Sequence, residues 1–186
     1  MRRTQLSPLS AFVVGFALVG CASTSTSSFR DPAFTQASYR KVAVMASGVQ
    51  LGTRQQIEGR LASALRGKHI QATEAMQLFP PTREIGQDDM MALLHERGFD
   101  GLLFVERVES GATSHVTNFL TAESEPREFV AFDARLIDIA SGQNAWVGSL
   151  RTEANSGYTS NSDILESFTS STADELDEKH LLASAH

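Results

Sequence analysis

The chain of 186 residues contains one cysteine, three lysines and one tryptophan. With a single thiol it cannot form an internal disulfide, nor a cysteine-based zinc or iron–sulfur site, which takes two to four thiols from one chain. The 22 acidic side chains outnumber the 16 basic ones and give a formal net charge of −6. Nucleic-acid binding depends on a basic surface that neutralises phosphates, so this composition argues against a DNA or RNA partner. The length fits one domain with short extensions.

The first 20 residues have the pattern of a secretory signal. Arg2 and Arg3 form a charged start, and an uncharged, largely apolar stretch then runs from position 6 to position 20. This stretch is shorter than the ~20 apolar residues that a membrane-spanning helix needs. It ends in Leu-Val-Gly-Cys, with the only cysteine, Cys21, in the last place. An ordinary cleaved signal followed by a chance cysteine, or by a small buried thiol, is the alternative interpretation.

The tetrapeptide that ends at Cys21 resembles the lipobox of bacterial lipoproteins. The resemblance implies that the thiol of Cys21 carries diacylglycerol, that the signal is cut between Gly20 and Cys21, and that the new amino terminus is acylated, for example with palmitate. Several acyl chains, at about 0.8 kcal/mol per buried methylene, anchor a protein more firmly than one chain does. Ala22 stands where an aspartate would favour the inner membrane, which implies an outer-membrane location with the domain facing the periplasm. Beyond this covalent lipid we expect no cofactor.

Residues 21–38 are predicted to be the lipidated cysteine followed by a flexible tether. Six of the seven residues at 22–28 are Ser or Thr, and no helical or strand period follows as far as position 38. Such a segment buries little apolar area to offset its ordering entropy. Loss of the signal removes Arg2 and Arg3 and no acid, so the mature chain carries a net charge of −8. Anionic lipid surfaces should repel it, which leaves the lipid as the means of attachment.

Residues 39–186 are predicted to form a single α/β (α+β) domain. The expected strands cover residues 41–46, 70–73, 101–108, 128–139 and 144–154. The expected helices cover residues 53–68, 88–97 and 160–182. Gly98 is placed to end a helix in the left-handed conformation, and Gly142 to turn a hairpin. The order βαβαβββα predicts a mixed sheet of about five strands covered by about three helices.

Residues 111–127 form a longer connection than most structureless loops. They contain Val116, Phe119 and Leu120, three apolar side chains with no evident core to join. Three interpretations stay open: the flanking strands extend into a protruding ribbon, the segment contacts a partner, or it is a disordered loop with no binding role. We take Val116, Phe119 and Leu120 as candidate partner-contact residues.

The sequence contains no motif of catalytic or metal-binding residues. Glycines at positions 48 and 52 precede a helix, as in phosphate-binding loops, but the spacing and the lysine of a P-loop are missing. His95 and Glu96 begin as a zinc-protease motif does, yet Phe99 stands in the place of the second histidine. A catalytic carboxylate pair such as Asp133 and Asp138 would have the same sequence pattern as ordinary polar residues at the edge of a strand. We therefore expect neither catalytic residues nor a metal site.

Three segments of the body resemble a known group of domains: KVAVMASG at 41–48, ERGFDGLLFVERV at 96–108 and ARLIDIASGQNAWVGSLRTEA at 134–154. They look like periplasmic lipoprotein domains related to CsgG of curli secretion and to the amino-terminal domain of TolB. The matching positions are Gly98, Asp100, Asp138, Ser141, Gly142 and Trp146. These motifs describe a fold rather than a reaction. Trp146 is expected to pack under a helix, with an exposed partner anchor as the alternative.

Members of that group assist envelope assembly, secretion or cell-wall synthesis through protein contacts. Together with the lipobox, the predicted spacer and the absence of a catalytic motif, this leads us to expect a non-catalytic, lipid-anchored envelope protein whose periplasmic domain binds a protein partner. One alternative is a small-ligand-binding protein or enzyme, with a pocket at the strand ends near residues 48–53 or Asp100. Another is an oligomeric component of a secretion pore, which makes a homo-oligomer a further expectation; residues 111–127 are then the segment that could supply an additional strand pair.

Overall fold

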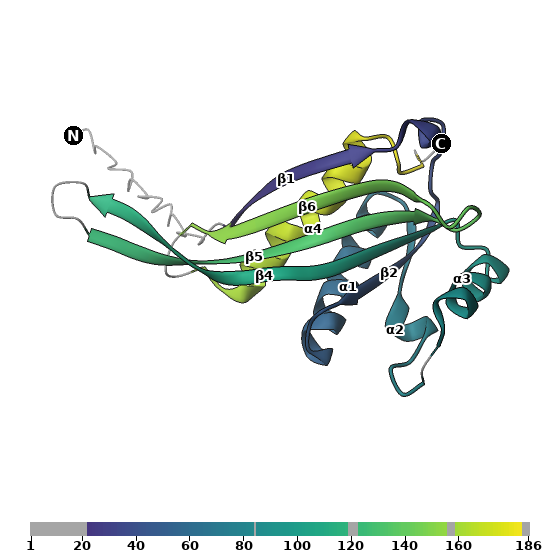
Figure 1. Cartoon of the computed structure of the whole chain (residues 1–186), viewed down its shortest axis with the longest axis horizontal. Helices are drawn as coiled ribbons and strands as arrows, with labels where there is room; N and C mark the ends of the chain where they lie inside the picture. Colours follow the sequence, from purple (N-terminus) through teal and green to yellow (C-terminus); the bar gives the residue numbers. More distant parts are fainter. Residues whose placement is uncertain (1–21, 84, 119–122, 156–158, 184–186) are drawn as a thin grey trace, which may run out of the picture.

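The computed structural model describes residues 22–83, 85–118, 123–155 and 159–183, so the signal and Cys21 lie outside the described residues. The strands are β1 (Ala22–Arg30), β2 (Lys41–Ser47), β3 (Gln71–Glu74), β4 (Gly101–Asn118), β5 (Glu123–Asp138) and β6 (Asn144–Ala154). The helices are α1 (Leu51–Gly67), α2 (Ala75–Leu78), α3 (Gln87–Glu96) and α4 (Asn161–Glu178), with a 3-10 turn, η1, at Pro32–Phe34. The strands form one sheet in the order β1-β6-β5-β4-β2-β3 (Figure 1).

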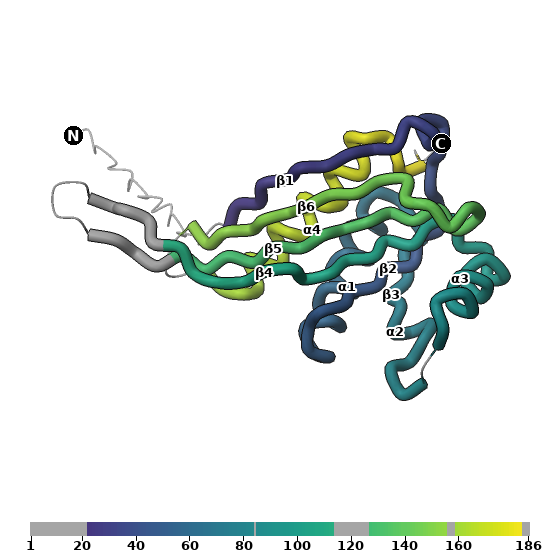
Figure 2. The backbone as a smooth tube through the Cα atoms, viewed as in Figure 1, coloured from purple at the N-terminus to yellow at the C-terminus, as the bar shows by residue number. Residues whose placement is uncertain are grey.

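The sheet is antiparallel on one side and parallel on the other. Each of the pairs β1–β6, β6–β5 and β5–β4 is antiparallel, whereas β2 pairs in parallel with both β4 and β3. The tube in Figure 2 shows β3 next to β2, beside the helices. The predicted mixed sheet and the order βαβαβββα are confirmed from β2 to α4. The described residues contain six strands and four helices, because β1 and the short α2 were not predicted.

The helices α1 and α4 cover one face of the sheet and enclose the main core. On α1, Ile57, Leu61 and Leu65 recur at helical spacing and are fully buried. Trp146 of β6 is 1% exposed and belongs to the same core, as expected for a residue that packs under a helix. Burial of a side chain of this size makes it a major contributor to the core.

Helix α4 is fixed at its start by a capping box and along its length by aromatic packing. The Ser160 hydroxyl accepts from the Asp163 amide, and the Asp163 carboxylate accepts from the Ser160 amide. These bonds to the charged form lower the pKa of Asp163. Further along, the ring of Phe168 stacks on that of Phe132 from β5, with centroids 4.3 Å apart.

The opposite face of the sheet is only partly covered. Ala43 of β2 and Leu102 of β4 point to this face and pack against Met90 and Leu94 of α3. Together with α2, this helix covers the part of the face formed by β2 and the start of β4 (Figure 1). The part formed by β1, β6 and most of β5 has no helix against it among the described residues.

The predicted tether at 21–38 is wrong for the described residues, because Ala22–Arg30 is the edge strand β1. Its ordering comes from hydrogen bonds rather than apolar burial. The Thr24 hydroxyl lies 2.8 Å from both the Thr152 and the Ser167 hydroxyls, and Ser28 donates to Glu175 of α4. A Ser/Thr strand shows no apolar period, so pattern analysis could not detect it. The folded domain therefore includes the strand at residues 22–30 as well as the residues from position 39 onward.

The strand pairing supports the ribbon interpretation of residues 111–127. Strand β4 continues to Asn118 and β5 begins at Glu123, so that the two pair beyond the last residue of β6. A bulge between Arg107 and Glu109 shifts the register at the base of the ribbon. Val116 pairs with Ser124 on this ribbon, whereas Phe119 and Leu120 lie outside the described residues.

Both predicted glycine turns are confirmed by their backbone angles. Gly98 follows α3 with φ of 72°, and Gly142 turns the β5–β6 hairpin with φ of 70°. Helix α4 ends at Glu178, before the predicted end at position 182, because His180 adopts the left-handed conformation and Leu181 turns into the core.

Candidate functional site

The uncovered part of the sheet forms a continuous surface, which we call the open face. It consists of the side chains on β1, β6, β5 and the middle of β4 that point away from α1 and α4. Strand side chains alternate between the two faces of a sheet, so every second residue contributes. Its members on β1 and β6 include Ser27, Phe29, Val147, Ser149 and Arg151, and those on β5 and β4 include Asp133, Arg135, Phe104 and Glu106.

One row across the open face combines apolar groups with a cation. The strand register places Phe29 opposite Val147, Val147 opposite Arg135, and Arg135 opposite Phe104. Phe29 is 60% exposed and Val147 is 36% exposed. The Arg135 guanidinium lies 5.0 Å from the centre of the Phe104 ring, a cation–π distance. The row thus carries an exposed aromatic ring next to an exposed aliphatic side chain.

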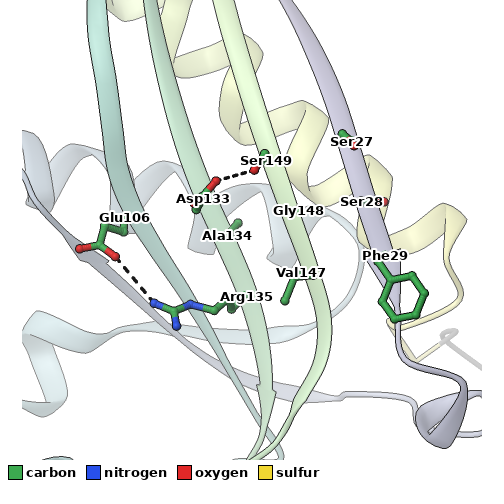
Figure 3. Close-up of a pocket in the computed structure, with 10 residues that line it drawn as sticks. All are labelled: Ser27, Ser28, Phe29, Glu106, Asp133, Ala134, Arg135, Val147, Gly148 and Ser149. Carbon is green, nitrogen blue, oxygen red and sulfur yellow. Dashed lines mark hydrogen bonds and ion pairs between the residues drawn. The ribbon is translucent and has the colours of Figure 1, made fainter.

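The next row is polar and its charges are already partnered. Ser27, Ser149, Asp133 and Glu106 lie opposite one another in turn. The Ser149 hydroxyl donates to the Asp133 carboxylate, and Glu106 Oε2 lies 3.7 Å from Arg135 Nη2 (Figure 3). Apart from Phe104, the residues of these two rows line an open hollow of about 540 Å³.

A third group of charges surrounds Arg151 on β6. Its Nε donates to Glu153 Oε1 at 2.8 Å, and its Nη1 lies 3.8 Å from Glu109 Oε2. The guanidinium also lies 3.5 Å from the centre of the Phe129 ring. The two acids of this group share one cation, Arg151, so the group mixes both signs of charge rather than forming a run of one sign.

This arrangement favours contact with a surface over chemistry on a small molecule. Asp133 and Glu106 are engaged by a hydroxyl and a guanidinium, and neither lies in an enclosed cavity. Within the described residues, no three His, Cys, Asp or Glu side chains come together in a way that could hold a metal ion. In the same part of the chain, no helix is long and apolar enough to cross a membrane.

Asp100, Asp138 and Ser141, which are among the positions that resemble the CsgG-related domains, make hydrogen bonds that stabilise the fold. The Asp100 carboxylate accepts from the Arg40 and Lys41 amides at 2.8 and 2.9 Å, which ties β4 to the start of β2. Asp138 accepts from the Ser141 amide and hydroxyl at 2.8 and 2.7 Å and so stabilises the hairpin turn.

Tyr39 connects the same turn to the core. Its hydroxyl donates to Asp138 Oδ2 at 3.3 Å, and its side chain is 2% exposed. Burial, followed by the negative charge of Asp138, raises the pKa of Tyr39 well above its ordinary value. This environment keeps the phenol neutral and in the role of donor.

Of the predicted partner-contact residues, Val116 lies on the ribbon strand β4, opposite Ser124 of β5. Phe119 and Leu120 lie outside the described residues, as do Gly20 and Cys21 of the predicted cleavage site. The residues that sequence reasoning missed are Phe29 and Val147. Val147 alternates out of phase with Trp146, Gly148 and Leu150, which was a signal that it points away from the core.

Comparison with known proteins identifies the fold but not a family. No family model and no curated protein sequence matches the chain. Among solved structures, the PelC dodecamer from Paraburkholderia phytofirmans is similar at a TM-score of 0.52 and 15% identity, covering 87% of this chain and 99% of that one.

A second crystal form of a PelC dodecamer, from a substituted protein of the same organism, gives a TM-score of 0.52 and 18% identity over 85% of this chain and 99% of that one. Lipoprotein GNA1162 from Neisseria meningitidis has a TM-score of 0.47 and 18% identity, with 75% of this chain and 99% of that one covered. The resemblance to CsgG and TolB domains stays a prediction. The chain thus shares its fold with PelC over most of its length.

Proposed function

We propose that this chain is a non-catalytic, lipid-anchored envelope protein whose open face binds a protein partner on the periplasmic side of the outer membrane. The observation that carries the proposal is the row of Phe29 and Val147, exposed side by side on a sheet surface that none of the described helices covers. Aromatic side chains exposed within a polar rim are typical anchors of protein interfaces. Serine, aspartate and arginine side chains around the row supply such a rim.

A lipid on Cys21 would fix the orientation of this surface. Ala22 is the first residue of β1, so no flexible spacer separates the sheet from the lipidated residue. Phe29 lies near the other end of β1, about 23 Å from Ala22 at the usual rise per strand residue. The Phe29 row then lies away from the bilayer, where a periplasmic partner can reach it.

The paired charges favour a protein over a small polar ligand. A ligand site needs polar groups that converge on it without a partner of their own. On the open face, Asp133 is bonded to Ser149, and Glu106 lies beside Arg135. Such paired groups add specificity to a contact between two proteins, whereas they leave no free polar group to bind a small ligand.

The anchor is tested by replacing Cys21 with Ser and fractionating cells that express the full chain. We expect the wild type in the outer membrane, labelled by radioactive palmitate, and Cys21→Ser without label and outside the outer-membrane fraction. Unchanged outer-membrane association of Cys21→Ser would contradict the anchor.

The open face is tested by a photoreactive phenylalanine analogue placed at position 29 of the full chain. Leu51 at the start of α1 is 58% exposed and serves as the matched control position. We expect one defined envelope protein to be cross-linked from position 29, not from position 51, and to be lost when Val147 is changed to Glu. Equal cross-linking from both positions would count against the open face.

A homo-oligomer is the second element of the proposal. It is supported by the fold shared with the PelC dodecamers. Light scattering of the full chain in detergent is the direct measurement. A monomer at all concentrations would remove this element and leave the anchor and the partner face standing.

A further inference from the structure

Two sheet edges lack a partner among the described strands and lack the usual protection against pairing. Within the described part of the chain, β1 pairs only with β6, which leaves its other edge free over all 9 residues. Strand β4 pairs with β2 only as far as Glu106, which leaves residues 108–118 with β5 as their one partner among the described strands. Free edges present rows of unpaired N–H and C=O groups, which are templates for another strand.

The direction of the free groups on β1 follows from one hydrogen bond. The Asp31 amide donates to the Ala145 carbonyl at 3.0 Å. The backbone N–H and C=O groups of the odd-numbered residues of β1 therefore point toward β6. In an antiparallel pair the residues between them point their N–H and C=O groups the other way. Thr24, Thr26 and Ser28 therefore offer their backbone groups to the outside of the sheet.

The remaining edges carry the usual protection against strand pairing. The free part of β5, residues 123–128, contains Pro126 and three glutamates, and β3 has only 4 residues before α2 begins. Proline, charge and short length all discourage edge pairing. By contrast, β1 and residues 108–118 contain neither lysine nor proline, and most of their residues are small or uncharged.

We propose that β1 of one copy of this chain pairs with residues 108–118 of β4 in a second copy. Strand direction alternates across β4, β5, β6 and β1, so that β1 runs opposite to β4. A second copy in the same orientation therefore meets β4 with an antiparallel strand and continues the antiparallel half of the sheet. The partner is a copy of this chain, and the interface is the strand pair.

The register is limited by β2 and by side-chain direction. Strand β2 occupies the edge of β4 up to Glu106, and a Cβ on Gly48 would lie 3.0 Å from the Arg107 carbonyl oxygen, so β1 has to pair beyond this point. Placing β1 on residues 108–116 sets Thr26 opposite Ala112. Thr26 points to the helix side of the sheet because it lies opposite the buried Leu150. Ala112 points to the same side because it lies opposite Glu128, two residues before Val130, which packs against the main core.

Such pairing uses different surfaces on the two copies. It is head-to-tail, so it produces a closed ring or an open filament rather than a two-fold dimer. The inference rests on the homo-oligomeric state proposed above and assigns its interface. It is independent of the partner on the open face, because the edges and the face are different surfaces.

The first test changes one outward-facing amide. Thr26→Pro removes an N–H that points away from β6, whereas Thr26→Ala keeps it, and proline is tolerated on edge strands. Both full-length variants and the wild type are compared by native mass spectrometry from detergent. We expect oligomers for the wild type and Thr26→Ala, and monomers for Thr26→Pro with unchanged circular dichroism. Wild-type monomers overturn the oligomer itself, and Thr26→Pro oligomers of wild-type size overturn only this interface.

The second test joins the two edges covalently. The double variant Thr26→Cys with Ala112→Cys is oxidised in membranes and run on a non-reducing gel. We expect a ladder of oligomers that collapses on reduction, and no ladder when Ala112→Cys is combined with Gln71→Cys on β3. Absence of a ladder from the first pair, or equal ladders from both, would overturn the strand pairing.

Discussion

The indole ring of Trp146 lies against Gly148 on the same strand, so that a Cβ added to Gly148 would be 2.5 Å from Cζ2 of Trp146. The two residues are both on the core side of β6, and the missing side chain of the glycine leaves the space that the indole fills. A small residue at position 148 is therefore part of the packing of the one tryptophan.

Gly148→Ala should lower the free energy of unfolding by about 1–3 kcal/mol, because overpacking a full core forces side chains and backbone to shift. Urea denaturation of the chain measures the effect. Gly59→Ala is the matched control: a Cβ there meets nothing within 4 Å, and helix α1 should gain about 0.5–1 kcal/mol. Equal stability of Gly148→Ala and wild type would show that the indole has another position available.

Glu58→Ala should cost about 1–3 kcal/mol, because it leaves buried donors without an acceptor. The fully buried carboxylate accepts from the Ala46 amide at 3.1 Å and the Met76 amide at 2.9 Å, and it pairs with Arg54 Nε at 2.7 Å. It thus joins α1 to β2 and α2.

Glu58→Gln keeps one acceptor oxygen and should lose less stability in the same urea experiment. Glu166, whose side chain is 71% exposed beside Arg60, is the surface control, and Glu166→Ala should change stability by less than about 1 kcal/mol. Equal losses for Glu58→Ala and Glu166→Ala would contradict a linking role for Glu58.

Arg30→Ala should release the amino-terminal strand. The Arg30 guanidinium donates to the carbonyl of Lys179 after α4 and, at 2.7–3.2 Å, to the carbonyls of Phe34, Thr35 and Ala37. We expect faster hydrogen exchange over residues 22–38 than in the wild type, measured by mass spectrometry. Arg40→Ala, at an exposed position, should leave the exchange of this segment unchanged. Rapid exchange of the segment in the wild type would restore the tether interpretation.

The stability of the fold should fall in alkali through Tyr39. Its pKa in the folded chain lies above the ordinary 10.0 because of burial and the Asp138 charge. The unfolded chain therefore loses this proton near pH 10, while the folded chain keeps it. The stabilising effect is fully present below pH 10 and is lost as pH rises toward the higher pKa of the folded state.

The Tyr39→Phe variant cannot lose this proton. Its urea midpoint should decline less than that of the wild type between about pH 8 and pH 11. Parallel declines of the two proteins would show that Tyr39 is not responsible.

Periodicity predicted most of the body correctly. The helical spacing of Ile57, Leu61 and Leu65 and the alternation in residues 128–154 report directly on burial, since each pattern exists only because one face is apolar. The turns at Gly98 and Gly142 could be predicted because both need a positive φ, which residues other than glycine seldom adopt. The ribbon at 111–127 was one of three open interpretations, because polar residues on a solvated strand pair carry no period.

By itself, the sequence determined the element order from β2 to α4, the buried Trp146 and the prediction of a lipidated Cys21. Only the tertiary structure decided that residues 22–30 are a strand and that Phe29 and Val147 meet on an open face. Strand β1 is ordered by β6 and α4, more than a hundred residues away, through backbone pairing and Ser/Thr hydrogen bonds. Such long-range hydrogen bonds leave no local pattern, whereas apolar burial leaves a period in the chain.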